Sequence, residues 1–115
     1  MYIEDLTLHR HVYHSGDYVN ISVNLWNIYS SMLNYTLLVM VYDPDNSPLF
    51  ATGIQGSLEP GKRGTHTFGF TLPWTAQEGA YRVEVMVMND YPSRAGDDWE
   101  LYAPPVGVGF YVVYP

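Results

Sequence analysis

The sequence contains one group of histidines, a residue type that often binds metal ions. His9 and His11 are two residues apart, so on an extended strand they point to the same side, and His14 follows three residues later. A tight site needs three or four ligands, and no carboxylate partner is identifiable. The alternative is an exposed polar edge strand. The fourth histidine, His66, is expected in the core or at its rim.

Acidic side chains gather in one long connection, between about Asp90 and Pro105. The acidic residues lie in two short segments, Asn89-Asp90 and Asp97-Asp98-Trp99-Glu100, and they are Asp90, Asp97, Asp98 and Glu100. Calcium takes six to eight oxygen ligands, and such a loop supplies several of them, although the spacing matches no EF-hand. A solvated acidic loop is the ordinary interpretation, and calcium remains an alternative.

The aromatic residues raise the question of sugar binding, because sugars stack on flat aromatic platforms. Trp74 and Trp99 lie in connections that are expected to leave opposite ends of the fold, so with Trp26 they do not form one platform. Loops held by a rigid scaffold are common recognition elements. The alternative site for a ligand is a tyrosine-rich group at one loop end, formed by Tyr29, Tyr35, Tyr91 and Tyr102.

Motifs of catalysis are absent from the sequence. It contains no Gly-x-Ser-x-Gly elbow, no His-Glu-x-x-His and no glycine-rich phosphate loop. We therefore expect a protein that is not an enzyme and that needs no cofactor. Asn20-Ile21-Ser22 and Asn34-Tyr35-Thr36 are glycosylation sequons, which agree with an extracellular location.

Composition limits the class of protein further. The chain has 115 residues, of which 47% are hydrophobic, so residues 1–115 are expected to form one domain with a real core. Five basic residues against twelve acidic ones give a net charge of −7, which argues against nucleic acid as a partner. No cysteine is present, and no apolar run is long enough to span a bilayer. No leader segment is recognisable.

Apolar residues alternate with polar ones along most of the chain, which is typical of half-buried strands. Turn residues separate the alternating runs, and no window has a helical pattern. About seven short strands in this length predict an all-β, immunoglobulin-like antiparallel sandwich. The expected strands cover about Glu4 to Val12, Val19 to Leu25, Leu37 to Tyr42, Pro48 to Ile54, Thr65 to Leu72, Tyr81 to Met88 and Val106 to Tyr114.

The two sheets of this sandwich are expected to have unlike outer faces. The outward residues of the second and fifth strands are polar: Asn20, Ser22, Asn24, Thr65, Thr67 and Thr71. The other sheet has an apolar outer face, and apolar patches of this kind mark interaction sites. The predicted protein interface consists of Leu38, Met40, Tyr42, Met86, Met88, Tyr111 and Val113. The alternative is that the segment from Asp90 to Pro105 covers this face within the same chain.

Four segments carry a resemblance to a known class of domain. They are Gly16–Val23, Val41–Pro44, Leu58–Gly61 and Gly79–Val83. With them the chain resembles immunoglobulin-like accessory domains of prokaryotic, often archaeal, surface proteins, of the CARDB and macroglobulin types. The resemblance implies a spacer or protein-binding module without an active site. It also suggests that Tyr81 forms a tyrosine corner, its hydroxyl bonded to nearby backbone.

These observations predict a non-catalytic interaction or spacer domain of a cell-surface or secreted protein, with a homodimer or another protein as partner. An archaeal filament or surface-layer accessory protein is one version, by analogy. Two alternatives remain: a module that binds carbohydrate or calcium at its loop end, and a protease-inhibitor-like sandwich that presents one loop as bait.

Overall fold

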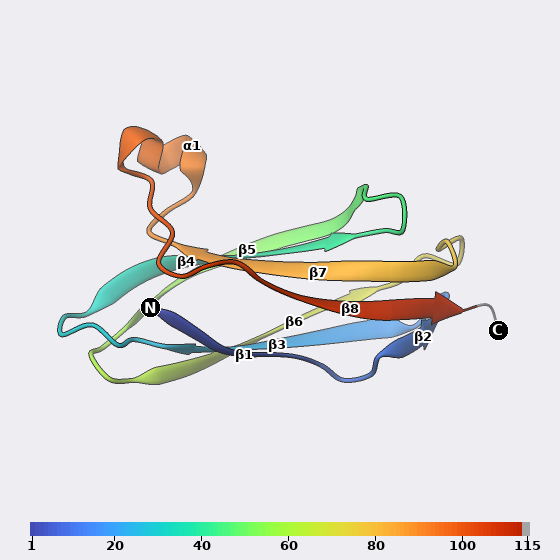
Figure 1. Ribbon diagram of the computed structural model, residues 1–115, viewed down its shortest axis with the longest axis horizontal. Coiled ribbons are helices and arrows are strands. Elements are labelled where there is room, and N and C mark those ends of the chain that lie inside the picture. Colours follow the sequence, from blue (N-terminus) through green and yellow to red (C-terminus); the bar gives the residue numbers. More distant parts are fainter. Residues whose placement is uncertain (114–115) are drawn as a thin grey trace.

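The computed structural model describes residues 1–113, which form two packed sheets (Figure 1). One sheet has the order β1-β3-β6 and the other the order β2-β8-β7-β4-β5. The predicted all-β, immunoglobulin-like sandwich is therefore confirmed. No helix among the described residues is long and apolar enough to cross a membrane. The elements are β1 (Tyr2–Leu8), β2 (Val12–His14), β3 (Tyr18–Trp26), β4 (Leu33–Tyr42), β5 (Pro48–Leu58), β6 (Arg63–Thr71), β7 (Gly79–Met88), α1 (Pro92–Ala95), the 3₁₀ turn η1 (Gly96–Asp98) and β8 (Val106–Val113).

The first expected strand, Glu4 to Val12, is divided between the two sheets. β1 pairs antiparallel with β3, whereas β2 pairs parallel with β8, so this one pair departs from the antiparallel pattern. The chain crosses from one sheet to the other between Leu8 and Val12. The crossing buries Tyr13, whose ring meets the edge of Phe110 at a centroid distance of 5.4 Å. Alternation alone gave no sign of this switch, because apolar residues continue on both sides of it.

β5 is longer than expected, since it extends from Pro48 to Leu58 instead of ending near Ile54. Its second half pairs with the first half of β4, where Leu33 lies opposite Leu58. The polar and glycine residues of this half gave no alternating signal. At the other terminus, Tyr114 was expected in the last strand and lies outside the described residues.

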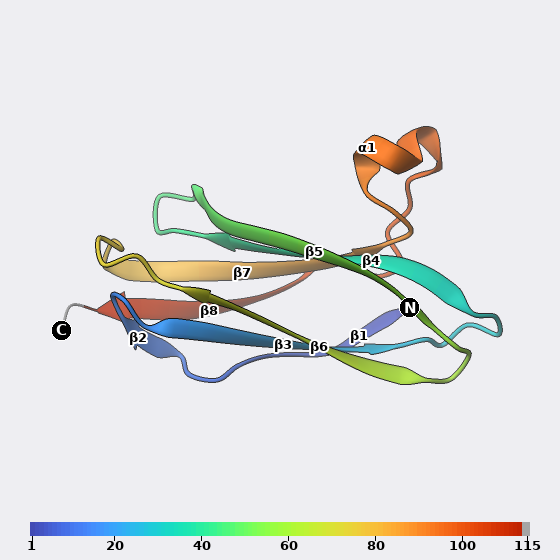
Figure 2. The same ribbon diagram turned by 180° about the vertical axis from the view of Figure 1, so that it is seen from behind.

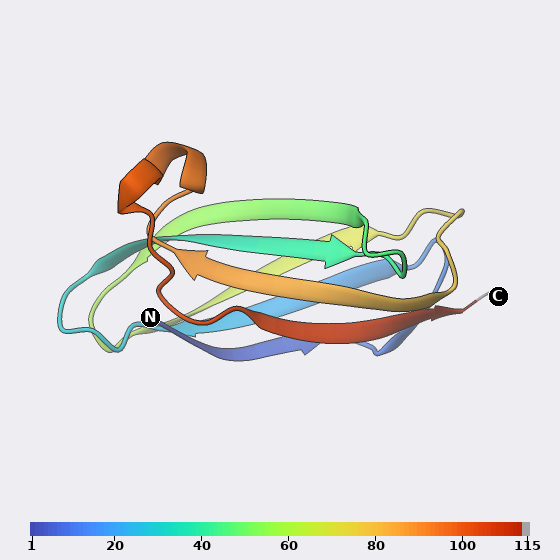
Figure 3. The same ribbon diagram turned by 45° about the horizontal axis from the view of Figure 1, so that its top comes forward.

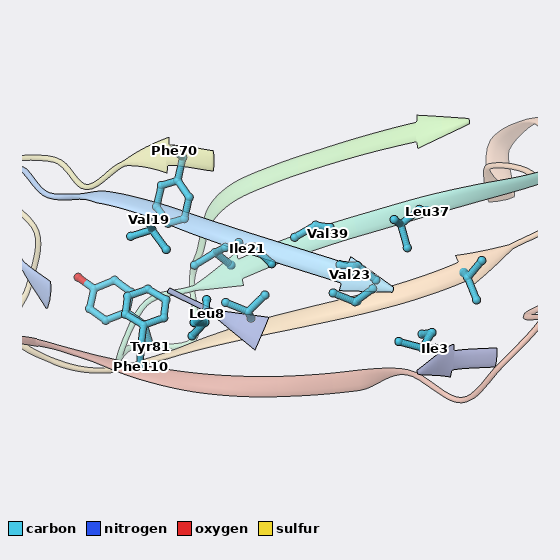
Figure 4. Close-up of a cluster of buried hydrophobic side chains, with 14 of the residues drawn as sticks. Ile3, Leu8, Val19, Ile21, Val23, Leu37, Val39, Phe70, Tyr81 and Phe110 are labelled. Carbon is cyan, nitrogen blue, oxygen red and sulfur yellow. The ribbon is translucent and has the colours of Figure 1, made fainter. Parts of the chain in front are cut away.

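The core consists of the inward residues of both sheets (Figure 4). The predicted inward set of β4 is correct, since Leu37, Val39 and Val41 are fully buried. Inward side chains of facing sheets interdigitate in sandwiches of this kind. The fully buried apolar residues of β3 and β7 are Val19, Ile21, Val23, Leu25, Val83, Val85 and Val87.

A buried amide side chain joins two connections at one end of the sandwich. Asn27 follows β3, and its Nδ2 donates to the carbonyl oxygens of Ser31 and Leu58 at 3.0 and 2.8 Å. Its Oδ1 accepts the N–H of Tyr29 at 3.0 Å. Because each of these polar groups has a partner, full burial of Asn27 carries no desolvation penalty for a missing bond.

The predicted tyrosine corner is present. The Tyr81 hydroxyl donates to the Gln77 carbonyl oxygen at 2.7 Å, and the ring stacks on Phe110 at a centroid distance of 5.2 Å. The bond fixes the connection between β6 and β7 against the start of β7.

Replacement of Tyr81 by Phe removes this hydrogen bond and keeps the ring. We expect Tyr81→Phe to lower the free energy of unfolding by about 1 kcal/mol, the usual contribution of such a bond. Urea denaturation checks this, with Tyr42→Phe as the matched control, because the Tyr42 hydroxyl has only a weak contact with the Met40 sulfur at 3.8 Å. Equal losses in the two variants would contradict a structural role for the corner.

Candidate interaction face

The outer face of the five-stranded sheet is set by the pairing of β4 with β7. Leu38 lies opposite Met86, Met40 opposite Glu84 and Tyr42 opposite Arg82. These residues alternate with the buried valines, so they point away from the core. The predicted apolar face requires that β4 and β7 pair in this register, and they do.

Small residues flank the apolar ones on both neighbouring strands. Gly53 lies opposite Leu38 on β5, and Ala51 lies opposite Met40. On β8, Gly107 and Gly109 take the corresponding outward positions. Leu38, Met40, Tyr42 and Met86 are all half-buried, although no strand or helix formed by residues 1–113 lies over the middle of the sheet (Figure 3).

One end of the face is covered by the connection between β7 and β8, which contains α1 (Figure 3). The Trp99 indole N–H donates to the Met88 sulfur at 3.3 Å, and Met88 is only 1% exposed. The Tyr91 hydroxyl lies where a Cβ of Gly53 would be. Met88, included in the predicted interface, is therefore buried within its own chain, and internal cover extends from this end of the face to Gly53, which lies opposite Leu38.

A charged pair divides the uncovered part of the face. The Arg82 guanidinium lies over the Tyr42 ring, 4.4 Å from its centroid, and 3.9 Å from the Glu84 carboxylate.

Beyond this pair, the edge of the sheet near β2 carries a second apolar group. It contains Tyr111, which is 59% exposed, and Val113. Val12, 50% exposed and paired with Tyr111, belongs to this group. Sequence reasoning missed Val12, because it placed this residue in the other sheet.

The three-stranded sheet has the polar outer face that the sequence predicts. Thr65 donates to Asn24 at 2.7 Å, and the hydroxyls of Ser22 and Thr67 lie 3.5 Å apart. Asn20, the first sequon residue, is exposed on this face. The two outer surfaces therefore differ sharply in polarity, and the apolar one belongs to the five-stranded sheet.

The predicted histidine group does not share one strand face. His9 and His11 lie in the crossing between β1 and β2, and His14 ends β2. In the loop between β7 and β8, Asp90 accepts from Gln55 at 3.0 Å and lies 3.7 Å from Arg94. Within residues 1–113, no three histidine or acidic side chains lie together as metal ligands would.

The tryptophans lie apart, as predicted. Trp74 follows β6 and Trp99 precedes β8, and these connections are at opposite ends of the molecule (Figure 1). Trp74 is 80% exposed, and its ring lies 2.7 Å from the position of a Cβ on Gly16, whose φ of +83° also requires glycine. Among the four loop-end tyrosines, Tyr35 is buried and Tyr29 is exposed, whereas Tyr91 and Tyr102 are intermediate.

A shallow polar hollow of about 490 Å³ lies beside the covered end of the face, between β4, β5 and the β7–β8 connection. Beneath it, the Tyr35 hydroxyl lies 2.5 Å from Nε2 of His66 and so links β4 with β6. Burial raises the pKa of Tyr35 and lowers the pKa of His66. Both shifts favour the neutral forms of the two groups, and the imidazole tautomer decides which of them donates. The hollow is lined by Asn34, Tyr35, Gln55, Gly56, Ser57, Asn89 and Asp90.

No family model matches the chain, and no curated protein matches its sequence. Solved structures do match. A CARDB domain from Pyrococcus furiosus, in complex with di-metal ions, has a TM-score of 0.68 at 18% identity, with 98% of this chain and 96% of that chain covered. The C-terminal domain of wzt has a TM-score of 0.66 at 13% identity, with 97% and 72% covered.

A third match is part of a larger enzyme. The alkylpurine DNA glycosylase AlkC of Pseudomonas fluorescens, bound to DNA with an abasic site analog, has a TM-score of 0.68 at 14% identity. The match covers 96% of this chain and 29% of the glycosylase chain, so this chain spans less than a third of that protein. These similarities establish a shared immunoglobulin-like fold.

The Tyr35–His66 pair predicts a pH dependence of stability. The pKa of His66 is lowered in the folded state from its ordinary value of 6.5, so below this pH the unfolded chain binds more protons. Stability is therefore complete above about pH 6.5 and decreases as the pH falls toward the folded-state pKa. The loss is modest, because His66 is half-buried and water screens its charge.

Urea denaturation at about pH 7.5 and about pH 5.5 checks this expectation. His66→Gln should lose less stability between the two pH values than the wild type does. The exposed His9, changed to Gln, is the matched control and should keep the wild-type loss. If His66→Gln and His9→Gln behave alike, the pair does not determine the acid response.

Proposed function

We propose that this chain is a non-catalytic accessory domain that binds another protein through the outer face of its five-stranded sheet. The observation that carries the proposal is the uncovered apolar surface around Met40 and Met86, next to Ala51 of β5 and the glycines of β8. Methionine and tyrosine are enriched at the centres of protein interfaces, and large apolar patches are rare on monomers. The opposite sheet offers no such surface.

We also propose that the chain is a CARDB-type domain and that it is displayed at a cell surface or in a secreted protein. The end-to-end structural match with a CARDB domain supports the first of these two statements. Two exposed sequon asparagines, Asn20 and Asn34, agree with an extracellular location. The non-catalytic role is supported by the missing motifs of catalysis and by the shallowness of the hollow beside the face.

The length of the molecule leaves room for an interface of ordinary size on this face. A standard specific interface buries about 800 Å² on each partner. The face runs along a molecule whose longest dimension is 49 Å. The Arg82–Glu84 pair at its centre supplies one charge of each sign, which fixes the register of a partner without net repulsion.

A double variant tests the face. We expect Met40→Lys with Met86→Glu to weaken association by at least about tenfold, because two charged groups would replace apolar side chains and would have to lose water when the contact forms. Sedimentation equilibrium of the wild type and the variant measures self-association, and circular dichroism checks that both are folded.

The matched control places the same two charges on the polar face. Ser22→Lys with Thr67→Glu alters a cross-strand pair of the three-stranded sheet and should sediment as the wild type does. If the wild type self-associates and the two double variants remain equally associated, the apolar face is not a contact between copies.

A further inference from the structure

Asn20 lies on the polar outer face and has room on both sides. It belongs to β3, the central strand of the three-stranded sheet, and its cross-strand neighbour on β6 is Gly69, which has no side chain. On the other side β1 ends at Leu8, and only the backbone of His9 reaches the Asn20 carbonyl oxygen, at 3.4 Å. Figure 2 shows this sheet as the lower layer of the molecule, with α1 on the opposite side. The Asn20 side chain is therefore accessible from solvent.

The ring of Tyr18 lies across Gly69, directly beside Asn20. Tyr18 is two residues before Asn20 on the same strand, so both side chains point outward. It pairs with Thr71, which makes Gly69 its diagonal neighbour, within reach of an aromatic side chain. A Cβ on Gly69 would collide with the Tyr18 hydroxyl and would lie 2.7 Å from Cε2 of the ring. Tyr18 is nevertheless 56% exposed, so one side of its ring covers Gly69 and the other is open to solvent.

Two asparagines of β3 point outward between its ends, and they differ in their side-chain bonds and in the residues that follow. Asn24 accepts a hydrogen bond from the Thr65 hydroxyl at 2.7 Å, and no serine or threonine stands two residues after it. The Asn20 amide has no hydrogen-bond partner within residues 1–113, and the sequon serine, Ser22, follows it on the same face. The free amide is thus the one in an acceptor sequence.

We propose that Asn20 carries an N-linked glycan whose first sugar stacks on the open side of the Tyr18 ring. The modification requires the location outside the cell that is proposed above. The Nδ2 atom of Asn20 forms a bond with the anomeric carbon of an oligosaccharide that is supplied on a lipid-linked phosphate donor. The bond between this carbon and the phosphate oxygen breaks. The lipid phosphate leaves, and it takes up the proton that the amide nitrogen loses.

The position of the Tyr18 ring brings it within reach of such a sugar. Residues directly opposite each other on two strands have Cβ atoms about 5 Å apart. Because the Tyr18 ring occupies the place opposite Asn20 that a side chain at Gly69 would take, a sugar on Asn20 meets the ring and not bare backbone. Aromatic rings offer a large, rigid apolar surface, and the C–H groups of a sugar pack on it.

A glycan at this place also affects which sheet is available to partners. Glycans are bulky and solubilising, so one at Asn20 shields the outer face of the three-stranded sheet. The apolar face around Met40 and Met86 belongs to the other sheet and stays uncovered by the glycan. The glycan therefore limits association to the surface that we assign to a protein partner.

Secretion of the chain from eukaryotic cells tests the modification. Intact mass spectrometry of the wild type should show a glycan at Asn20, which peptide mapping locates after peptide N-glycosidase converts the modified asparagine to aspartate. Asn20→Gln should lack this glycan. Asn34→Gln is the matched control, because it removes the other exposed sequon asparagine, and it should keep the glycan at Asn20. A secreted, folded wild type with unmodified Asn20 overturns the inference.

Thermal denaturation tests the stacking. The glycosylated wild type should unfold about 2 to 4 °C above the same chain made without glycans in bacteria. Tyr18→Ala should lose most of this difference between the two forms, whereas Tyr18→Phe keeps the ring and should retain it. Tyr2→Ala is the matched control, since Tyr2 is 50% exposed on the same sheet and meets Trp26 at the other end of β3. It should also retain the difference.

A glycan that raises the unfolding temperature equally in the wild type and in Tyr18→Ala overturns the inference, as does a glycan without any effect. Neither result depends on the apolar face, because Met40→Lys with Met86→Glu changes the opposite sheet and should leave the glycan and its effect unaltered. A stacked glycan on a chain whose apolar face binds nothing would contradict only the proposed protein contact. The two proposals can therefore fail separately.

Discussion

The two-residue alternation of β4 and β7, held in one register, determines the surfaces of this molecule. With Leu38 opposite Met86, the valines between these positions are buried and the methionines are outside. A shift by one residue would exchange the two sets and place the apolar side chains of both faces in wrong environments. The core and the apolar face are thus two results of a single pairing.

The connections between strands cover and hydrogen-bond the ends of the sandwich, and the register of β4 and β7 does not depend on them. Asn27 satisfies the backbone of two turns at one end, and Trp99 with Tyr91 folds the β7–β8 segment onto the sheet. Polar bonds within that segment occupy Asp90, which binds Gln55 and lies near Arg94. Acidic residues that resemble a ligand set in the sequence therefore serve, at Asp90, to hold the loop.

Sequence reasoning predicted what depends on alternation and turn residues. The inward residues of β4 and the polar face with Asn24 and Thr65 follow from local patterns, whereas the Tyr81 corner follows from the resemblance to a known class of domain. It could not predict contacts made by residues far apart in the chain. Neither the burial of Met88 by Trp99 nor the transfer of Val12 to the second sheet leaves a periodic signal, because each depends on how a connection folds.

The parallel pair of β2 and β8 has a mechanical consequence. The N-terminus lies toward one end of the long axis and β8 ends near the other, as Figure 1 shows. A pulling force applied at these two points draws β2 and β8 along their own lengths in opposite directions. Their hydrogen bonds, including the one from the Tyr111 N–H to the His11 carbonyl oxygen, are then strained together rather than one after another. The short strand that closes the sheet therefore acts as a shear clamp against extension.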